Sequence, residues 1–319
     1  MATVTRHVWA MPGVATLPGA GGPLNIPIWG YSLNSSTCRV PGPVLEVTVG
    51  DTLRVIFHNH LAEPASLIFP GQVMTPQPVR DSENYLVSFD RHARAGGYVV
   101  YSRRTSRPGT FRYESGTNPG VQVQMGLSGA LLVRPRSFNP GDPATWTAYG
   151  SGTRSEYDRE QLLILGDVDS ALHVAVGAGL PYDLLEFRPD WWTINGRAFP
   201  ETVAPDEPSS TQPMGSRVLA APGDRVLLRC VNTGFSPHAL HLGGLSGRVV
   251  AEDARPLKTP SLDATYEKET VLLAPGQVCD VVVTSPTAGE FYLFDRDLKH
   301  TVNEGGFPGG MMTRLEFTT

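Results

Sequence analysis

The sequence predicts an all-β protein, and three observations lead to this class. The chain of 319 residues contains 34 glycines and 28 prolines, and its β-branched runs are short and bounded by turn residues. No long stretch has helical periodicity, and no apolar run reaches the roughly 18 residues that a membrane-spanning helix needs. Hydrophobic residues make up 40% of the chain, which is enough for one large or two medium cores.

Charge and composition exclude several classes of partner. The net charge is −5 and there is no basic run, which argues against nucleic acid as a partner. The absence of a long apolar run argues against a membrane protein. Residues 1–8 lack the apolar core of a signal peptide, so we expect a cytoplasmic protein, with a chain whose signal has been removed as the alternative. Cys38, Cys230 and Cys279 have no metal-binding spacing, and we interpret them as buried small hydrophobic residues.

Turn signals organise the chain into two similar halves. In the first half, Gly50-Asp51 separates two alternating strands, and the second of these strands ends near Asn59. The second half repeats this pattern as Gly223-Asp224 followed by Asn232. Asn195-Gly196 is a separate hairpin signal.

A polar segment separates the two halves. Residues 138–159 are rich in glycine, proline and serine, which is typical of a linker between domains. We therefore predict a first domain at residues 1–137, a linker at 138–159 and a second domain at 160–319.

Several segments resemble the multicopper oxidases and copper nitrite reductases of the two-domain type. The segments that carry this resemblance are Pro41-Gly42-Pro43, residues 108–133, residues 192–200, Ser236-Pro237-His238-Ala239-Leu240-His241, and residues 289–303 with the following Gly310-Met311. The resemblance covers roughly residues 25–135 and 160–317. It implies two cupredoxin-like domains, each a Greek-key β-sandwich or barrel.

The resemblance also implies where copper ligands would lie. His238 falls at the mononuclear blue-copper position, His241 falls at the catalytic three-copper cluster, and Gly243 takes the next histidine position. The other cluster positions hold Ile68, Pro70, Glu114, Gly116, Asp295 and Asp297. Ser115 and Arg296 take the place of the copper-binding cysteines, and neither supplies the thiolate that a blue site needs. We therefore expect most copper ligands to be replaced, so that neither a three-copper cluster nor a blue site forms.

The first functional hypothesis is an enzyme without a cofactor that acts on a small organic molecule. Glu114, Asp295 and Asp297 would lie beside His241 in the former copper-cluster cleft. Because like charges that lie close together raise one carboxyl pKa, a general acid would be available near neutral pH. His241 would act as a base or would anchor the substrate.

Two alternatives stay open. One is an oxidoreductase with a single copper, zinc or iron ion, held by His238, His241 or His300 together with carboxylates. The other is a non-catalytic binding or structural protein, in which a salt-bridge network with Arg296 fills the former cavity.

The resemblance also implies an oligomeric state, and one loop carries a group of basic residues. Two-domain relatives close a ring of three chains, so we expect a homotrimer. Arg103, Arg104 and Arg107 are interpreted as a solvated loop, and the alternative is a contact with an anionic substrate.

Overall fold

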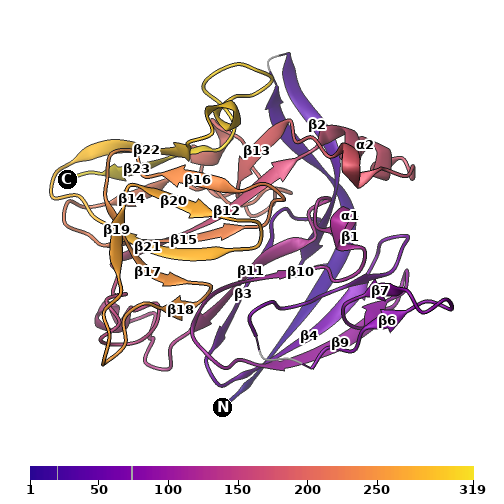
Figure 1. Ribbon diagram of the computed structural model, residues 1–319, viewed down its shortest axis with the longest axis horizontal. Helices are drawn as coiled ribbons and strands as arrows, with labels where there is room; N and C mark the ends of the chain where they lie inside the picture. Colours follow the sequence, from indigo (N-terminus) through magenta and orange to yellow (C-terminus); the bar gives the residue numbers. More distant parts are fainter. Residues whose placement is uncertain (20, 73–74) are drawn as a thin grey trace.

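The computed structural model describes residues 1–19, 21–72 and 75–319, and it confirms the all-β prediction. Each half of the chain forms a pair of main sheets around an apolar core, and the core of the first half continues into second-half residues such as Leu227 and Val250. The two halves lie side by side, with the first half in indigo to magenta and the second in rose through orange to yellow (Figure 1).

The first half contains a four-stranded and a three-stranded sheet. The four-stranded sheet has the order β2 (Gly22–Ser32), β1 (Thr3–Gly19), β4 (Thr52–Asn59) and β9 (Tyr98–Arg104). The three-stranded sheet has the order β10 (Gly109–Glu114), β11 (Ser128–Arg134) and β3 (Gly42–Thr48). Two short pairs join β5 (Ala65–Ser66) to β8 (His92–Ala93), and β6 (Val79–Arg80) to β7 (Leu86–Ser88).

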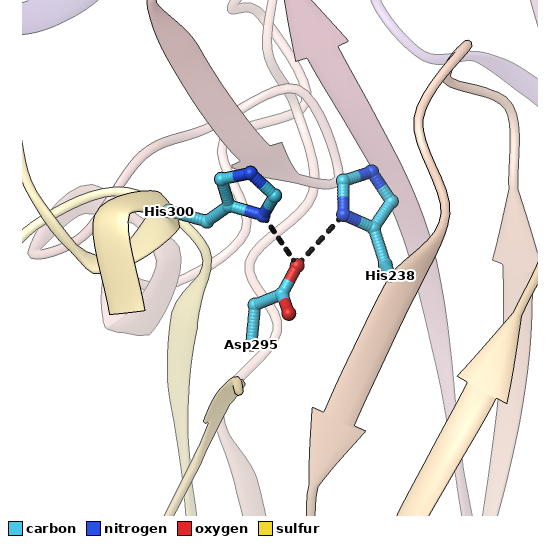
Figure 2. A group of neighbouring side chains, drawn as sticks. All are labelled: His238, Asp295 and His300. Carbon is cyan, nitrogen blue, oxygen red and sulfur yellow. Dashed lines mark hydrogen bonds and ion pairs between the residues drawn. The ribbon is translucent and has the colours of Figure 1, made fainter. Parts of the chain in front are cut away.

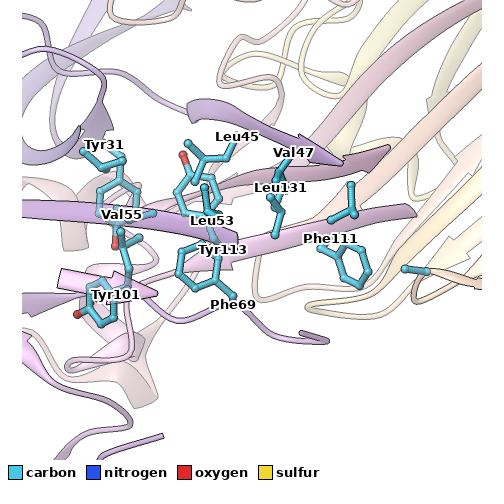
Figure 3. Packing of buried hydrophobic residues seen from close by; sticks show 14 of the residues in the cluster. Tyr31, Leu45, Val47, Leu53, Val55, Phe69, Tyr101, Phe111, Tyr113 and Leu131 are labelled. Carbon is cyan, nitrogen blue, oxygen red and sulfur yellow. Dashed lines mark hydrogen bonds between the residues drawn. The ribbon is translucent and has the colours of Figure 1, made fainter. Parts of the chain in front are cut away.

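Alternation of side chains builds the core between these sheets. Every second residue of β4 is buried, so Leu53, Val55 and Phe57 point inward. They pack with residues such as Leu131 and Tyr113 from the facing sheet (Figure 3).

The second half contains a seven-stranded and a five-stranded sheet. The larger sheet has the order β13 (Trp191–Ile194), β12 (Arg159–Val168), β15 (Val226–Asn232), β21 (Val278–Val283), β17 (Gly247–Glu252) and β18 (Arg255–Pro256), with β19 (Tyr266–Lys268) also paired to β17. The smaller sheet has the order β14 (Val218–Ala220), β23 (Met312–Phe317), β22 (Gly289–Asp295), β16 (His238–His241) and β20 (Thr270–Leu273).

Helices are short and lie in the connections. The helical elements are α1 (Pro119–Gln122), α2 (Ser170–Gly177), η1 (Pro143–Thr145), η2 (Leu184–Glu186), η3 (Glu201–Val203) and η4 (Leu298–Thr301). Among the described residues, none of these helices has the length and apolar character required to span a bilayer. The three cysteines are buried and carry free thiols, as predicted.

A buried polar network joins the two halves. Arg229 on β15 is 2% exposed and lies 3.6 Å from the fully buried carboxylate of Asp280 on β21. From the first half, the hydroxyl of Thr110 donates to Asp280 over 2.8 Å. Tyr149 and Tyr157 from the predicted linker are buried here too, and Tyr149 donates to Asp280 over 2.6 Å. The linker is therefore packed into the interface between the two halves.

The predicted internal repeat is confirmed by matching hydrogen bonds. Asn59 ends β4, and its side-chain amide donates to the carbonyl of Glu63 over 2.7 Å. Asn232 ends β15, and its amide donates to the carbonyl of Ser236 over 2.8 Å. Each asparagine thus closes a turn to the carbonyl four residues later, at the same place in its half.

The predicted Asn195-Gly196 hairpin turn is also confirmed. Both residues have positive φ, at 54° and 75°, and Ile194 pairs with Arg197 across them. These angles are those of the two-residue turn that matches the twist of antiparallel strands.

Candidate functional site

Two histidines and one carboxylate meet inside the second half. Nδ1–H of His238 and Nδ1–H of His300 each donate to Oδ2 of Asp295 over 2.8 Å (Figure 2). The possible ligand atoms of the three residues all lie within 4.8 Å of one another. The residues are between 0% and 4% exposed, so the group is closed to bulk solvent.

The loop that leads to His238 is held by two buried polar side chains. Asn232 closes the turn to Ser236, and it also accepts from the N–H of Gly234 over 2.9 Å. The carboxylate of Asp167 on β12 accepts from the N–H of Ser236 over 2.8 Å. The chain therefore enters β16 in a fixed direction, and His238, its first residue, points into the protein.

Strand pairing places Asp295 opposite β16. Leu240 and Asp295 are partners in the antiparallel pair of β16 and β22. Oδ1 of Asp295 accepts from the main-chain N–H groups of Ala239 over 3.2 Å and Asp297 over 3.0 Å. The main chain thus holds one carboxylate oxygen, and the two histidines share the other.

The same contacts set the charge of Asp295. Burial by itself would raise the pKa of this carboxyl group, but hydrogen bonds from His238 and His300 reverse the effect. The pKa of Asp295 is consequently held well below its usual range. The carboxylate is ionised at neutral pH, so Asp295 does not fit the role of general acid that the first hypothesis offered it.

His300 is oriented by its neighbours. It lies in η4, and its ring stacks on that of Trp192 with the centroids 4.5 Å apart. Met311, whose side chain is fully buried, donates its N–H to the carbonyl of His300 over 2.8 Å. The carbonyl of Met311 also accepts from the N–H of Asp295 over 3.2 Å. The main chain of Met311 therefore ties His300 to Asp295.

The donor set fits a single metal ion but not a blue copper centre. Blue sites have two histidines, a cysteine thiolate and a weak axial methionine. Here a carboxylate lies between the two histidines. Two imidazoles and a carboxylate are ligands that zinc, iron or copper(II) accept. The main-chain and stacking contacts supply the outer support that orients ligands in such sites.

Asp295, and not its neighbour Arg296, lies beside His238. The Arg296 side chain is exposed, while its N–H donates to the carbonyl of Ala239 over 2.9 Å. Adjacent residues in extended chain point to opposite sides, so the inward position belongs to Asp295. The predicted salt-bridge network around Arg296 is likewise not formed: in the described part of the chain, no ion pair includes this residue.

His241 does not share the site with His238. The two residues are three positions apart on β16 and therefore face opposite sides of the strand. His241 Nδ1 lies 3.1 Å from Oγ1 of Thr270, and its ring meets Phe294 edge to face. Three histidines were predicted as alternative metal ligands. The structure brings His238 and His300 together and separates His241 from them.

Glu114 does not contact the other predicted acid–base residues within the described part of one chain. Glu114 on β10 forms an ion pair with Arg112 at 3.1 Å. Asp297 is half-exposed and pairs with Lys299 at 3.1 Å. Among the residues that the structure describes, no hydrogen bond or ion pair joins Glu114 to His241, Asp295 or Asp297. Burial raises the pKa of Glu114 and the charge of Arg112 lowers it, so the cause is desolvation and not the predicted crowding of like charges.

Ser115 occupies a polar niche in the first half. Its hydroxyl donates to Oε1 of Gln122 over 2.6 Å, and Gln122 in turn donates to Glu63 over 2.8 Å. The resemblance had put Ser115 at a cysteine position, and here its hydroxyl is buried and hydrogen-bonded.

Sequence comparison connects this fold to a family. Residues 34–137 match the family described as Multicopper oxidase. The chain is 23% identical to the copper resistance protein A homolog of Pseudomonas syringae pathovar tomato, in an alignment that covers 96% of this chain and 54% of that protein. It is 24% identical to Laccase-15 of rice, over 80% of this chain and 39% of that protein. The chain thus spans about half the length, or less, of these curated relatives.

Solved structures with the same architecture cover nearly the whole chain. The blue copper oxidase from Nitrosomonas europaea matches with a TM-score of 0.74 and 23% identity, over 99% of this chain and 86% of that one. The copper nitrite reductase from the same organism matches with a TM-score of 0.70 and 20% identity, over 99% and 94% of the two chains. These likenesses confirm the predicted fold of two cupredoxin-like domains.

Part of this chain is therefore similar in sequence to the multicopper oxidases, and its fold is that of two-domain blue copper oxidase and copper nitrite reductase structures. Its family segment lies in the first half, while the group of His238, Asp295 and His300 lies in the second.

Proposed function

We propose that this protein is a mononuclear metalloprotein with an oxidoreductase role, and that His238, Asp295 and His300 hold its ion. The observation that carries this proposal is the convergence of two imidazoles and one carboxylate in a closed site. The proposal includes the replacement of the blue and three-copper centres, because the residues at the ligand positions implied by the resemblance are mostly not copper ligands.

Each residue of the group has a distinct role. Asp295 supplies the negative charge that compensates part of a divalent ion's charge. His238 and His300 supply neutral nitrogen ligands in orientations fixed by the strand pairing and by Trp192. A copper or iron ion would supply one-electron redox chemistry here. Zinc has no redox chemistry, so it would only stabilise the folded protein. Because the three residues are buried, the role that fits this site is exchange of electrons through the protein and not direct contact with a substrate.

Metal analysis tests the proposal. Purified protein is incubated with copper(II), zinc(II) or iron(II), freed of loose metal on a desalting column, and analysed by plasma mass spectrometry. We expect one ion per chain, and retention should fall at least tenfold in Asp295→Asn. Glu290→Gln is the matched control, because Glu290 is an exposed carboxylate at the other end of the same strand, β22, and pairs with Arg314. Equal metal retention in both variants, or no retention by the unaltered chain, would overturn the proposal.

Acid–base chemistry at Glu114 is the second candidate. The observation in its favour is that burial raises the pKa of Glu114. Because Glu114 and His241 do not touch within one chain, this candidate requires a neighbouring chain to complete the cleft with Glu114, His241 and Asp297. Once a substrate is known, loss of turnover in Glu114→Gln without loss of metal would support it.

A further inference from the structure

Three arginines from both halves of the chain line one cavity. Arg107 and Arg112 come from the first half, beside and on β10, and Arg255 comes from β18 in the second half. The cavity has a volume of about 350 Å³, and Asp253 and Gly276 also line it. This volume falls within the range of small-molecule sites.

The structure separates the arginines that the sequence had grouped in one loop. Arg103 forms an ion pair with the carboxylate of Asp90, so its charge is already compensated. The Arg104 guanidinium lies beside Sδ of Met1, away from the cavity. Of these three, only Arg107 lines the cavity.

Arg107 is held in place without a counter-ion. Its guanidinium lies 5.4 Å from the centre of the Phe111 ring, and one of its terminal nitrogens donates to the carbonyl of Asp253 over 3.3 Å. Its Nε is buried and has no acceptor within the described part of the chain. A buried N–H donor without an acceptor destabilises the folded protein. An acceptor that enters the cavity would supply the missing hydrogen bond to this guanidinium.

The cavity also carries uncompensated positive charge. Arg112 is paired with Glu114 at 3.1 Å. Among the described residues, no carboxylate oxygen lies within ion-pair distance of Arg107 or Arg255. Burial and the neighbouring charge of Arg255 lower the pKa of Arg107, and the smaller opposing effects of Tyr149 and Asp253 do not offset them.

Gly276 lets the side chain of Arg112 lie against the main chain. A Cβ atom at Gly276 would lie 3.0 Å from the guanidinium of Arg112, and the φ angle of this glycine is +78°. The close approach keeps the guanidinium at the wall of the cavity, where its Nε donates to the carbonyl of Gly276 over 3.3 Å.

We propose that this cavity binds the oxyanion group, carboxylate or phosphate, of a small molecule. Guanidinium groups match both oxyanions through paired N–H donors, and a lysine-type point charge would not offer this geometry. Arg107 and Arg255 contact the oxyanion, and Arg112 with Glu114 forms the wall. The site lies between the domains and does not depend on the ion proposed at His238, Asp295 and His300.

Calorimetric titration tests the site in the full chain after treatment with a chelator, so that failure of the metal proposal does not affect the result. The probes are inorganic phosphate, phenyl phosphate, citrate and benzoate, each at the same total ionic strength set with sodium chloride. We expect saturable binding of at least one probe, and the tighter class identifies the oxyanion as phosphate or carboxylate.

Matched variants assign the binding to the cavity. Arg107→Gln and Arg255→Gln should each weaken the binding at least tenfold, and Arg107→Lys should weaken it too, because it keeps the charge and loses the paired donors. Arg94→Gln removes an exposed arginine outside the cavity and should leave binding within twofold. Arg255 is exposed, so its replacement tests the site even when replacement of Arg107 impairs folding. Absence of saturable binding by all four probes, or equal weakening in Arg94→Gln and Arg255→Gln, would refute the proposal.

Discussion

Nδ1 of His238 lies 2.8 Å from Oδ2 of Asp295, although 57 residues separate them along the chain. The antiparallel pairing of β16 with β22 creates this contact, and η4 adds His300 to the same carboxylate oxygen. The second half thereby holds an anionic carboxylate between two imidazoles, whereas a blue copper centre combines its two imidazoles with a thiolate.

Replacement of this carboxylate by a thiolate should create a blue copper centre. We expect Asp295→Cys, loaded with copper(II), to develop an intense visible absorption band, because two imidazoles and a thiolate form the ligand set of such centres. The unaltered protein should show no such band. Arg296→Cys is the control: its side chain points away from His238, so it should stay colourless. A visible band in Arg296→Cys and none in Asp295→Cys would show that the site is assigned to the wrong face.

The buried polar network between the halves should contribute strongly to stability. Arg229→Met removes the cation next to Asp280 and leaves that carboxylate buried without its charge partner. We expect the free energy of unfolding to fall by about 3–5 kcal/mol, the usual effect of breaking a buried pair. Urea denaturation followed by tryptophan fluorescence measures the change.

A surface pair provides the comparison for Arg229. Arg248 and Glu267 lie 3.1 Å apart with side chains 43% and 51% exposed. Arg248→Gln should change the free energy of unfolding by less than about 1 kcal/mol, because solvent screens exposed pairs. Similar losses in both variants would mean that the burial of Arg229 has no energetic consequence.

Acid should destabilise the protein through Glu160. Burial would raise the pKa of this carboxyl group, but hydrogen bonds and charge from Arg134 and Arg229 lower it from 4.5 to about 2. A depressed carboxyl pKa stabilises the folded state above the unfolded pKa, and this contribution is lost as the pH falls from about 4.5 to about 2. The expected loss is on the order of 2–3 kcal/mol.

The variant Glu160→Gln isolates this effect. It should be less stable than the unaltered protein at pH 7, and its stability should change less between pH 5 and pH 3. Denaturant titrations at these pH values measure both quantities. Parallel pH profiles for the two proteins would contradict the assignment of this pH dependence to Glu160.

Assembly into a ring of three chains is a further prediction. Glu114 and His241 make no contact within the described part of one chain, so a cleft that contains both requires a second chain. We expect light scattering coupled to size exclusion to give three times the mass of one chain. A monomer mass would remove the intersubunit cleft, and with it the acid–base candidate.

The sequence by itself determined the fold class and much of the local structure. Short strands bounded by turns gave the all-β assignment, and the two Gly-Asp…Asn patterns located equivalent strand ends at Asn59 and Asn232. Asn195-Gly196 specified its hairpin. These features depend on turn chemistry and on strand periodicity, which are local properties of the chain.

Tertiary structure decided which side chains form the sites. A shift of one residue exchanges the two faces of a strand, and the sequence pattern around Asp295 and Arg296 did not specify which of them points inward. The cavity of Arg107 and Arg255 unites residues 148 positions apart, the difference between 255 and 107. Both outcomes depend on long-range strand pairing and domain packing, which fix distances between residues that are remote in the sequence.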